Sequence, residues 1–173
     1  MSDVIALGAI RALVSAGLRV PEDVSVIGDV ELGENASIWY GVVLRGDVDK
    51  IKIGANTSIQ DNAVAHCSTG NPTIIGDNCV VGHNAIIHSC VVEAGCLIGM
   101  GSILLDGCHI GAGSIVAAGA VVSPNTVVPP CSMVMGIPGR VVRQLTDKDI
   151  EGITLSVGHY IAYAKEQLPQ YHI

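Results

Sequence analysis

Three histidines in the middle of the chain could bind a metal ion. His83 and His88 lie in an apolar, glycine-rich segment, and His66 lies upstream of them. Three neutral imidazoles with an open fourth position are typical of catalytic zinc sites, which generate a hydroxide nucleophile near neutral pH. Alternatively, each histidine is an ordinary surface turn residue. The choice between a metal site and surface residues depends on the fold, because only a backbone that brings the three rings together can make a metal site.

A six-residue repeat indicates what that backbone is. An aliphatic residue followed by glycine recurs at steps of six, as in Ile75-Gly76, Val81-Gly82, Ile98-Gly99 and Ile110-Gly111. This period is the signature of a left-handed parallel β-helix, an all-β solenoid in which three units form one triangular coil. We expect the aliphatic residue to fill the interior and the glycine to turn the corner.

The repeat also sets the expected organisation of the chain. It is interrupted at residues 46–52 and 67–73, which we interpret as loops, and Pro124, Pro129 and Pro130 are expected to end regular strands. A capping box at Thr146 predicts a C-terminal α-helix from about residue 147 to 168. We therefore expect an N-terminal segment of undetermined conformation (1–20), a β-helix domain (21–130) and a C-terminal extension (131–173).

Composition excludes several classes of protein. The net charge of −7 argues against a nucleic-acid surface, and no apolar run is long enough for a membrane span. The N-terminus lacks the pattern of a signal or transit peptide. The six cysteines contain no Cys-x-x-Cys pair, so we expect reduced thiols in a cytoplasmic protein.

Counting the units places the histidines on the coils, since every third unit lies on the same side. One column holds the units that begin at Leu44, Ala65, Ile87 and Leu104, so the residues that follow the first three, Arg45, His66 and His88, stack on successive coils. A second column holds the units at Ile38, Ile59, Val81 and Ile98, which puts Gln60 and His83 on a different side. His83 could then join His66 and His88 only from another chain, which predicts a metal site between subunits of a cyclic trimer.

Other polar residues are expected near this site. Asp47 accompanies Arg45, and Asp61 follows Gln60. An ion pair between Arg45 and Asp61 of different subunits would hold the trimer and leave Gln60 free to orient a metal-bound water. An ordinary solvated ion pair is the alternative. The remaining histidines, 109, 159 and 172, have no stacked partner and are expected to be structural or exposed.

These residues resemble the γ-class carbonic anhydrases of the hexapeptide-repeat superfamily. The matching pieces are Leu44-Arg45-Gly46-Asp47, Ile59-Gln60-Asp61, His66, Gly82-His83, His88, Gly99-Met100-Gly101-Ser102 and Gly136-Ile137-Pro138-Gly139. The resemblance implies a homotrimer with Zn²⁺, or Fe²⁺ or Co²⁺, held by His66 and His88 of one chain and His83 of its neighbour. It also implies that Gln60 orients the hydroxide, and that Arg45, Asp47 and Asp61 organise the interface and the bicarbonate pocket. Tyr160 resembles the family's tyrosine on the C-terminal helix, and Ser58 and Met100 are also expected around the pocket.

The chain departs from the family pattern in its loops. The archetypal enzyme carries glutamates that move protons away from the metal, whereas neither interrupted segment here contains one, and Ser58 replaces an asparagine. The sequence therefore predicts a carbonic anhydrase-like lyase that hydrates CO₂ reversibly, with low activity. Two alternatives are a metal-dependent hydrolase or thioesterase acting on a CoA ester, and a catalytically weak structural or assembly homologue.

Overall fold

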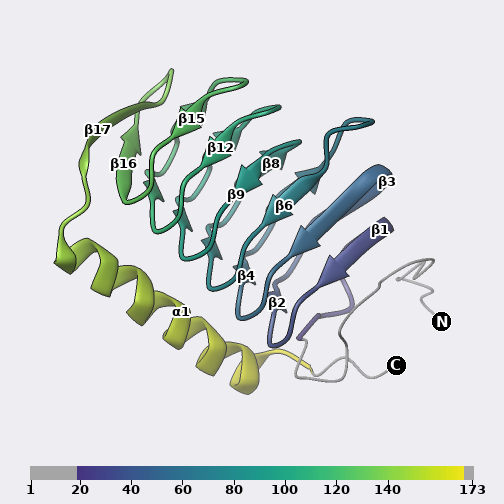
Figure 1. Ribbon diagram of the computed structural model, residues 1–173. Helices are drawn as coiled ribbons and strands as arrows, with labels where there is room; N and C mark the ends of the chain where they lie inside the picture. Colours follow the sequence, from purple (N-terminus) through teal and green to yellow (C-terminus); the bar gives the residue numbers. More distant parts are fainter. Residues whose placement is uncertain (1–18, 170–173) are drawn as a thin grey trace.

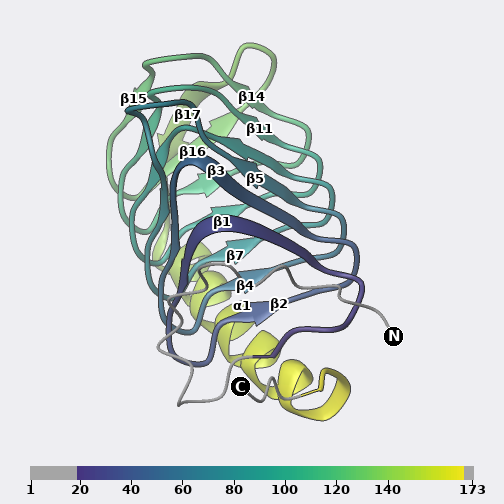
Figure 2. The same ribbon diagram turned by 90° about the vertical axis from the view of Figure 1, so that its right-hand side faces the viewer.

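The protein is a left-handed parallel β-helix with one C-terminal α-helix along its side (Figure 1). The structure is a computed structural model and describes residues 19–169. Seen along the coils in Figure 2, the chain winds repeatedly around a closed interior. The predicted fold class is therefore confirmed.

Short parallel strands line the three faces of the solenoid. The helix-side face comprises β2 (Ser37–Ile38), β4 (Ser58–Ile59), β7 (Val80–Val81), β10 (Leu97–Ile98), β13 (Ile115–Val116) and β16 (Ser132–Met135), with β17 (Arg140–Gln144) antiparallel to β16. The histidine face comprises the first halves of β1 (Ser25–Leu32) and β3 (Val43–Ile53), then β5 (Val64–His66), β8 (Ile86–His88), β11 (Ile103–Leu104) and β14 (Val121–Val122). The third face comprises the second halves of β1 and β3, then β6 (Thr73–Ile75), β9 (Val91–Val92), β12 (His109–Ile110) and β15 (Val127–Val128).

Aliphatic side chains stack in columns inside the solenoid. On the histidine face, Leu44, Ala65, Ile87 and Leu104 occupy equivalent positions on successive strands, and each is at most 1% exposed. The second predicted column, Ile38, Ile59, Val81 and Ile98, is also in register. Both predicted columns are confirmed, so branched aliphatic residues form this core without any phenylalanine.

The glycine of each repeat has a different role from the one expected. The corners are turned by residues further along the chain with positive φ, such as Asn56 (57°) and Asn84 (58°). A side-chain carbon on Gly82 would instead lie 2.7 Å from the backbone nitrogen of Met100 on the next coil. Glycine is therefore needed after the aliphatic residue because neighbouring coils approach closely there.

The structure contradicts the first of the two predicted loops, at residues 46–52. Residues 46–52 lie within β3, which runs without interruption from Val43 to Ile53 across a corner of the solenoid (Figure 1). β1 pairs with both ends of this segment, Gly28 opposite Gly46 and Val30 opposite Ile51, and the register shifts between these pairs, so residues 47–50 form a bulge opposite the single residue Asp29. The second segment does form a loop from Cys67 to Pro72, closed by a bridge between Ser68 and Asn71, and Thr73 begins β6.

The prolines do not end the solenoid. β15 follows Pro124, and β16 follows Pro129 and Pro130 and pairs parallel with β13, so the last coil extends to Met135. The expectation that these prolines end the regular strands was wrong because each lies at or next to a turn between short strands, where its missing N–H removes no sheet hydrogen bond.

Helix α1 (Asp147–Gln167) runs back along the helix-side face toward the first coils (Figure 1). Thr146 caps it: the Thr146 hydroxyl accepts from the backbone nitrogen of Asp149 at 3.3 Å, and the Asp149 carboxylate accepts from the Thr146 nitrogen at 2.7 Å. The helix buries Ile153 and Val157 against Val80. Within residues 19–169, no helix has the length and apolar character that crossing a membrane requires.

The N-terminal segment of residues 1–20 and His172 lie outside the described residues, apart from Arg19 and Val20 at the start of the first coil. All six cysteines are free thiols, as the absence of Cys-x-x-Cys pairs indicated.

Candidate metal centre

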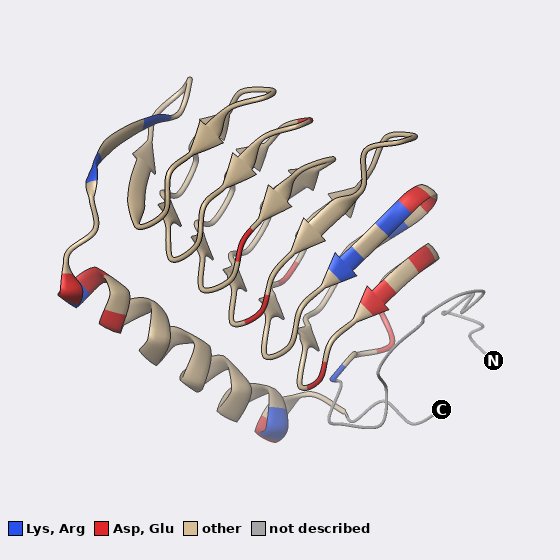
Figure 3. Ribbon diagram, viewed as in Figure 1, with Lys and Arg blue, Asp and Glu red and all other residues tan. Residues whose placement is uncertain are grey.

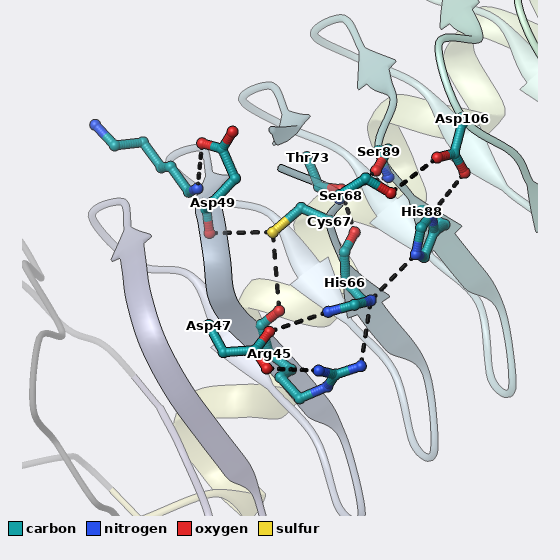
Figure 4. A network of polar contacts seen from close by, with 11 residues as sticks. Arg45, Asp47, Asp49, His66, Cys67, Ser68, Thr73, His88, Ser89 and Asp106 are labelled. Carbon is teal, nitrogen blue, oxygen red and sulfur yellow. Dashed lines mark hydrogen bonds and ion pairs between the residues drawn. The ribbon is translucent and has the colours of Figure 1, made fainter. Parts of the chain in front are cut away.

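The structure brings His66 and His88 together on the histidine face. β5 and β8 pair in parallel register with His66 opposite His88, and Arg45 on β3 lies opposite His66. Nδ1 of His66 lies 3.1 Å from Nε2 of His88, and the ring centroids are 5.1 Å apart (Figure 4). The stacking expected from the repeat is therefore confirmed.

Carboxylates hold the other nitrogen of each ring. Nε2 of His66 lies 3.0 Å from Oδ1 of Asp47, and Nδ1 of His88 lies 2.6 Å from Oδ1 of Asp106. An ionised carboxylate only accepts hydrogen bonds, so each outer nitrogen carries the proton. In neutral imidazoles the two inner nitrogens then present lone pairs to each other at 3.1 Å. Such lone pairs repel unless positive charge lies between them.

The two carboxyl groups are shifted toward their ionised forms. A hydrogen bond from Arg45 lowers the pKa of Asp47, partial desolvation opposes this effect, and a hydrogen bond from His66 lowers the pKa further. Desolvation raises the pKa of Asp106, but hydrogen bonds from His88 and Ser68 outweigh it, and the net shift is downward. Both residues therefore accept from the histidines at neutral pH.

Positive charge is scarce around the two rings. The guanidinium of Arg45 donates to Asp47 Oδ2 at 2.6 Å and reaches Nδ1 of His66 at 3.3 Å. Beyond the first coils the solenoid has no lysine or arginine until Arg140 (Figure 3). Two nitrogens 3.1 Å apart can both contact one ion at metal–nitrogen distances of about 2.0 to 2.1 Å, so the donor set fits a divalent metal.

His83 lies on a different part of the surface. It follows β7 at the corner between the helix-side and histidine faces, and its Nδ1 lies 2.7 Å from Oδ2 of Asp61. Within residues 19–169 no three His, Cys, Asp or Glu side chains are arranged to hold one metal ion. One chain thus supplies two of the three predicted ligands together and presents the third, 39% exposed, elsewhere.

Gln60, Met100 and Tyr160 lie beside His83. They line a largely apolar cavity of about 570 Å³ between the helix-side face and α1, together with Leu97. Gln60 is 4% exposed. Burial raises the pKa of Tyr160, and the charge of Asp61 adds to the rise, so its phenol stays protonated at neutral pH.

Ser58 does not line this cavity. Its hydroxyl accepts a hydrogen bond from Trp39 Nε1 at 3.0 Å, and the Trp39 ring packs edge-on against Tyr160 with centroids 5.9 Å apart. Ser58 therefore supports the helix that carries Tyr160. The ion pair between Arg45 and Asp61 was predicted between different subunits and stays a prediction; within one chain, Arg45 pairs with Asp47 and Asp61 with His83.

The sequence reasoning missed Asp106 and its partner Ser68. Asp106 lies on the coil beyond His88, one residue after the column position that Leu105 occupies, and Ser68 belongs to the loop after β5. Counting the column one coil further gives Leu105 opposite His88, so the repeat alone does not place Asp106 beside that ring. Ser68 gave no signal either, because its position depends on how the loop folds back.

Comparisons with known proteins identify the class of fold. Residues 89–124 match the bacterial transferase hexapeptide family and residues 72–105 the hexapeptide repeat of succinyl-transferase. A match of residues 1–41 to a periplasmic binding protein-like domain covers a segment that, from residue 25 on, forms the first coil. A solved hexapeptide transferase family protein from Anaplasma phagocytophilum is 38% identical, with a TM-score of 0.84 over 91% of this chain and 93% of that one. These matches define the class of protein as a hexapeptide-repeat β-helix.

Two curated relatives specify the family within this class. A protein of Methanocaldococcus jannaschii named "Probable carbonic anhydrase" is 46% identical over 86% of this chain and 94% of its own length. The mitochondrial gamma carbonic anhydrase 2 of Arabidopsis thaliana is 50% identical over 38% of this chain and 26% of its own length. The chain belongs to the γ-class carbonic anhydrase-like family of hexapeptide-repeat proteins.

Proposed function

We propose that this protein is a metal-dependent carbonic anhydrase that interconverts CO₂ and bicarbonate. The observation that carries the proposal is the pair of inner nitrogens of His66 and His88, 3.1 Å apart, whose outer nitrogens donate to Asp47 and Asp106. This donor set suits Zn²⁺, and Fe²⁺ or Co²⁺ are alternatives. A bound metal would supply the Lewis acidity that makes water a nucleophile at neutral pH.

The third ligand in this proposal is His83 of a neighbouring chain. Its imidazole is turned by Asp61 so that Nδ1 is occupied, which leaves Nε2 as the nitrogen available to a metal. Each chain thus carries two half-sites: His66 with His88 on one surface, and His83 on another. Joining the half-sites of two chains requires a head-to-tail contact, and a closed ring of three copies leaves no half-site without a partner. We propose that the functional unit is this homotrimer.

Other residues of the site have proposed roles that follow from their surroundings. The buried amide of Gln60, beside His83, would orient the attacking water by hydrogen bonding. Arg45 and Asp47 at one half-site and Asp61 at the other place opposite charges on the two surfaces that would meet, and the guanidinium would attract bicarbonate. Neither residues 46–52 nor 67–73 contain a glutamate to carry protons away, so we expect slow turnover.

The proposal has a direct test. Protein purified under reducing, anaerobic conditions is loaded with Zn²⁺, Fe²⁺ or Co²⁺, and its metal content and CO₂ hydration are measured by elemental analysis and stopped flow. We expect bound metal and hydration above buffer with at least one ion, and loss of both in His88→Ala. Metal-loaded protein that hydrates CO₂ no faster than buffer would refute the enzymatic proposal. The six free cysteines favour a reducing compartment, and we propose the cytoplasm.

A second candidate function is hydrolysis of a larger ester, such as a CoA thioester. The cavity beside His83 is favourable to it, because about 570 Å³ lined by Leu97, Ile115 and Met133 exceeds what CO₂ needs and lies in the range of sites for larger ligands. A panel of acyl-CoA substrates tests this candidate with the same metal-loaded protein. Uniform inertness toward the panel would reject it, while metal-dependent thiol release without CO₂ hydration would replace the first proposal.

A further inference from the structure

We propose that Asp106, held by Ser68, is a positioning residue that fixes the tautomer and orientation of His88 for metal binding. The proposal rests on the metal site proposed above, but it concerns a pair of residues on another coil and on a loop. Asp106 would act through His88 without touching the substrate.

Both oxygens of the Asp106 carboxylate are engaged. Oδ1 lies 2.6 Å from Nδ1 of His88, and Oδ2 accepts a hydrogen bond from the Ser68 hydroxyl at 3.0 Å (Figure 4). A carboxylate held at both oxygens cannot rotate freely, and its short, charge-assisted contact with His88 requires a proton on Nδ1. The lone pair of His88 is thereby confined to Nε2, the nitrogen that faces His66.

Ser68 is itself anchored to the strands that carry both histidines. Its backbone nitrogen donates to the Ser89 hydroxyl at 2.6 Å, and the Ser89 nitrogen donates to the hydroxyl of Thr73 at 2.9 Å. Thr73 in turn donates to the carbonyl oxygen of His66 at 2.5 Å. Ser89 is fully buried and adopts a positive φ of 47° directly after His88. This network joins the loop after His66 to the coil that carries His88, so Ser68 and Asp106 belong to one rigid arrangement.

The expected effect on metal binding follows from the chemistry of imidazole. An asparagine at position 106 has an NH₂ group that can donate to Nδ1 and so favour the tautomer with a proton on Nε2. That proton occupies the position where the metal binds. Loss of such a partner typically weakens metal binding by about 10- to 100-fold. Ser68→Ala leaves the carboxylate in place and should weaken binding by a smaller factor in the same direction.

The chain offers a matched control in Glu93. This carboxylate lies 2.8 Å from Nε2 of His109 on the third face, and it is exposed to a similar degree, 41% against 45% for Asp106. Glu93→Gln therefore removes the same kind of acid–histidine contact at a distance from His66 and His88. We expect its metal affinity to equal that of the unchanged protein.

The experiment measures Zn²⁺ and Co²⁺ affinity of the assembled protein by competition with a chelator, together with the tautomer of His88 by ¹⁵N NMR of the metal-free protein. We expect Asp106→Asn to bind metal about 10- to 100-fold more weakly and to shift His88 from the Nδ1–H to the Nε2–H tautomer. Equal affinity in Asp106→Asn and Glu93→Gln with an unchanged tautomer would overturn the proposal. If Asp106→Asn does not fold, Ser68→Ala must show the weaker binding, and unchanged affinity there would overturn it.

These outcomes separate the inference from the proposed function. Asp106-dependent metal binding in a protein that does not hydrate CO₂ would remove the enzymatic proposal and leave the role of Asp106 intact. Hydration of CO₂ by a protein whose metal affinity does not change in Asp106→Asn would remove the role of Asp106 and leave the enzymatic proposal intact. The NMR measurement needs neither metal nor CO₂, so it reports on Asp106 in either case.

Discussion

His66 and His88 face each other across one step of the solenoid, with Nδ1 of the first 3.1 Å from Nε2 of the second. Each ring is fixed from behind by an aspartate, Asp47 for His66 and Asp106 for His88. The backbone sets this relationship, because parallel strands in register place residues of equal position directly above one another. A pair of converging imidazoles is therefore built into the coil before any second chain is present.

Removing either imidazole should abolish metal binding while leaving the fold intact. His66 and His88 are partly exposed and lie outside the packed interior, so His66→Ala or His88→Ala removes a ligand without creating a core cavity. We expect no bound metal by elemental analysis and a melting temperature close to that of the metal-free unchanged protein. His109→Ala, which removes a histidine with its own glutamate partner, serves as the control and should retain metal. Full metal content in His88→Ala would contradict the assignment of this ligand.

Gly82→Ala should destabilise the protein near His83. The added carbon would lie 2.7 Å from the backbone nitrogen of Met100, so the two coils must separate locally, at a cost of about 1 to 3 kcal/mol. Chemical denaturation measures the change in the free energy of unfolding. Gly152→Ala in α1 is the control, because nothing lies within 4 Å of the added carbon and alanine favours the helix by about 0.5 to 1 kcal/mol. Equal stability of the two variants would show that the coils do not require glycine at position 82.

Acid should weaken the cap of α1. Hydrogen bonds from Arg143 and then Thr146 hold the pKa of Asp149 well below its usual value. Since the pKa is depressed in the folded state, this contribution is complete above the unfolded pKa of about 4 and is lost as the pH falls through the folded pKa. We expect Asp149→Asn to be less stable than the unchanged protein at pH 7 and the difference to shrink below about pH 4. Thermal unfolding of both proteins across this pH range measures it, and a difference that grows in acid would contradict the account.

The columns of the fold were predictable because they depend only on counting. Counting the repeat units in order, across the two interruptions, assigns Leu44, Ala65 and Ile87 to one column without knowledge of any contact, and the stacking of His66 with His88 follows from it. The helix was predictable for a different reason: Thr146 and Asp149 form a capping box, which can be recognised from residue types and spacing alone.

The features that were missed depend on contacts between coils. Residues 46–52 stay within β3 because β1 pairs with both ends of the segment across a bulge, which the six-residue count does not show. Gly82 is required by the nearness of Met100, which no local pattern reveals. Ser68 reaches Asp106 only through the path of its loop. Local chemistry and periodicity therefore predict the coil, whereas the surroundings of His66 and His88 depend on how the loop after β5 and the neighbouring coils fold.

The most direct test of the central claim is complementation between two inactive variants. His83→Ala lacks one half-site and His88→Ala the other, so each alone should show neither bound metal nor CO₂ hydration. Co-expressed in equal amounts, they should recover about a quarter of the unchanged activity and metal content, because random assembly of a head-to-tail ring pairs intact half-sites at one interface in four. Mixed assemblies that remain metal-free and inactive would contradict a site shared between chains.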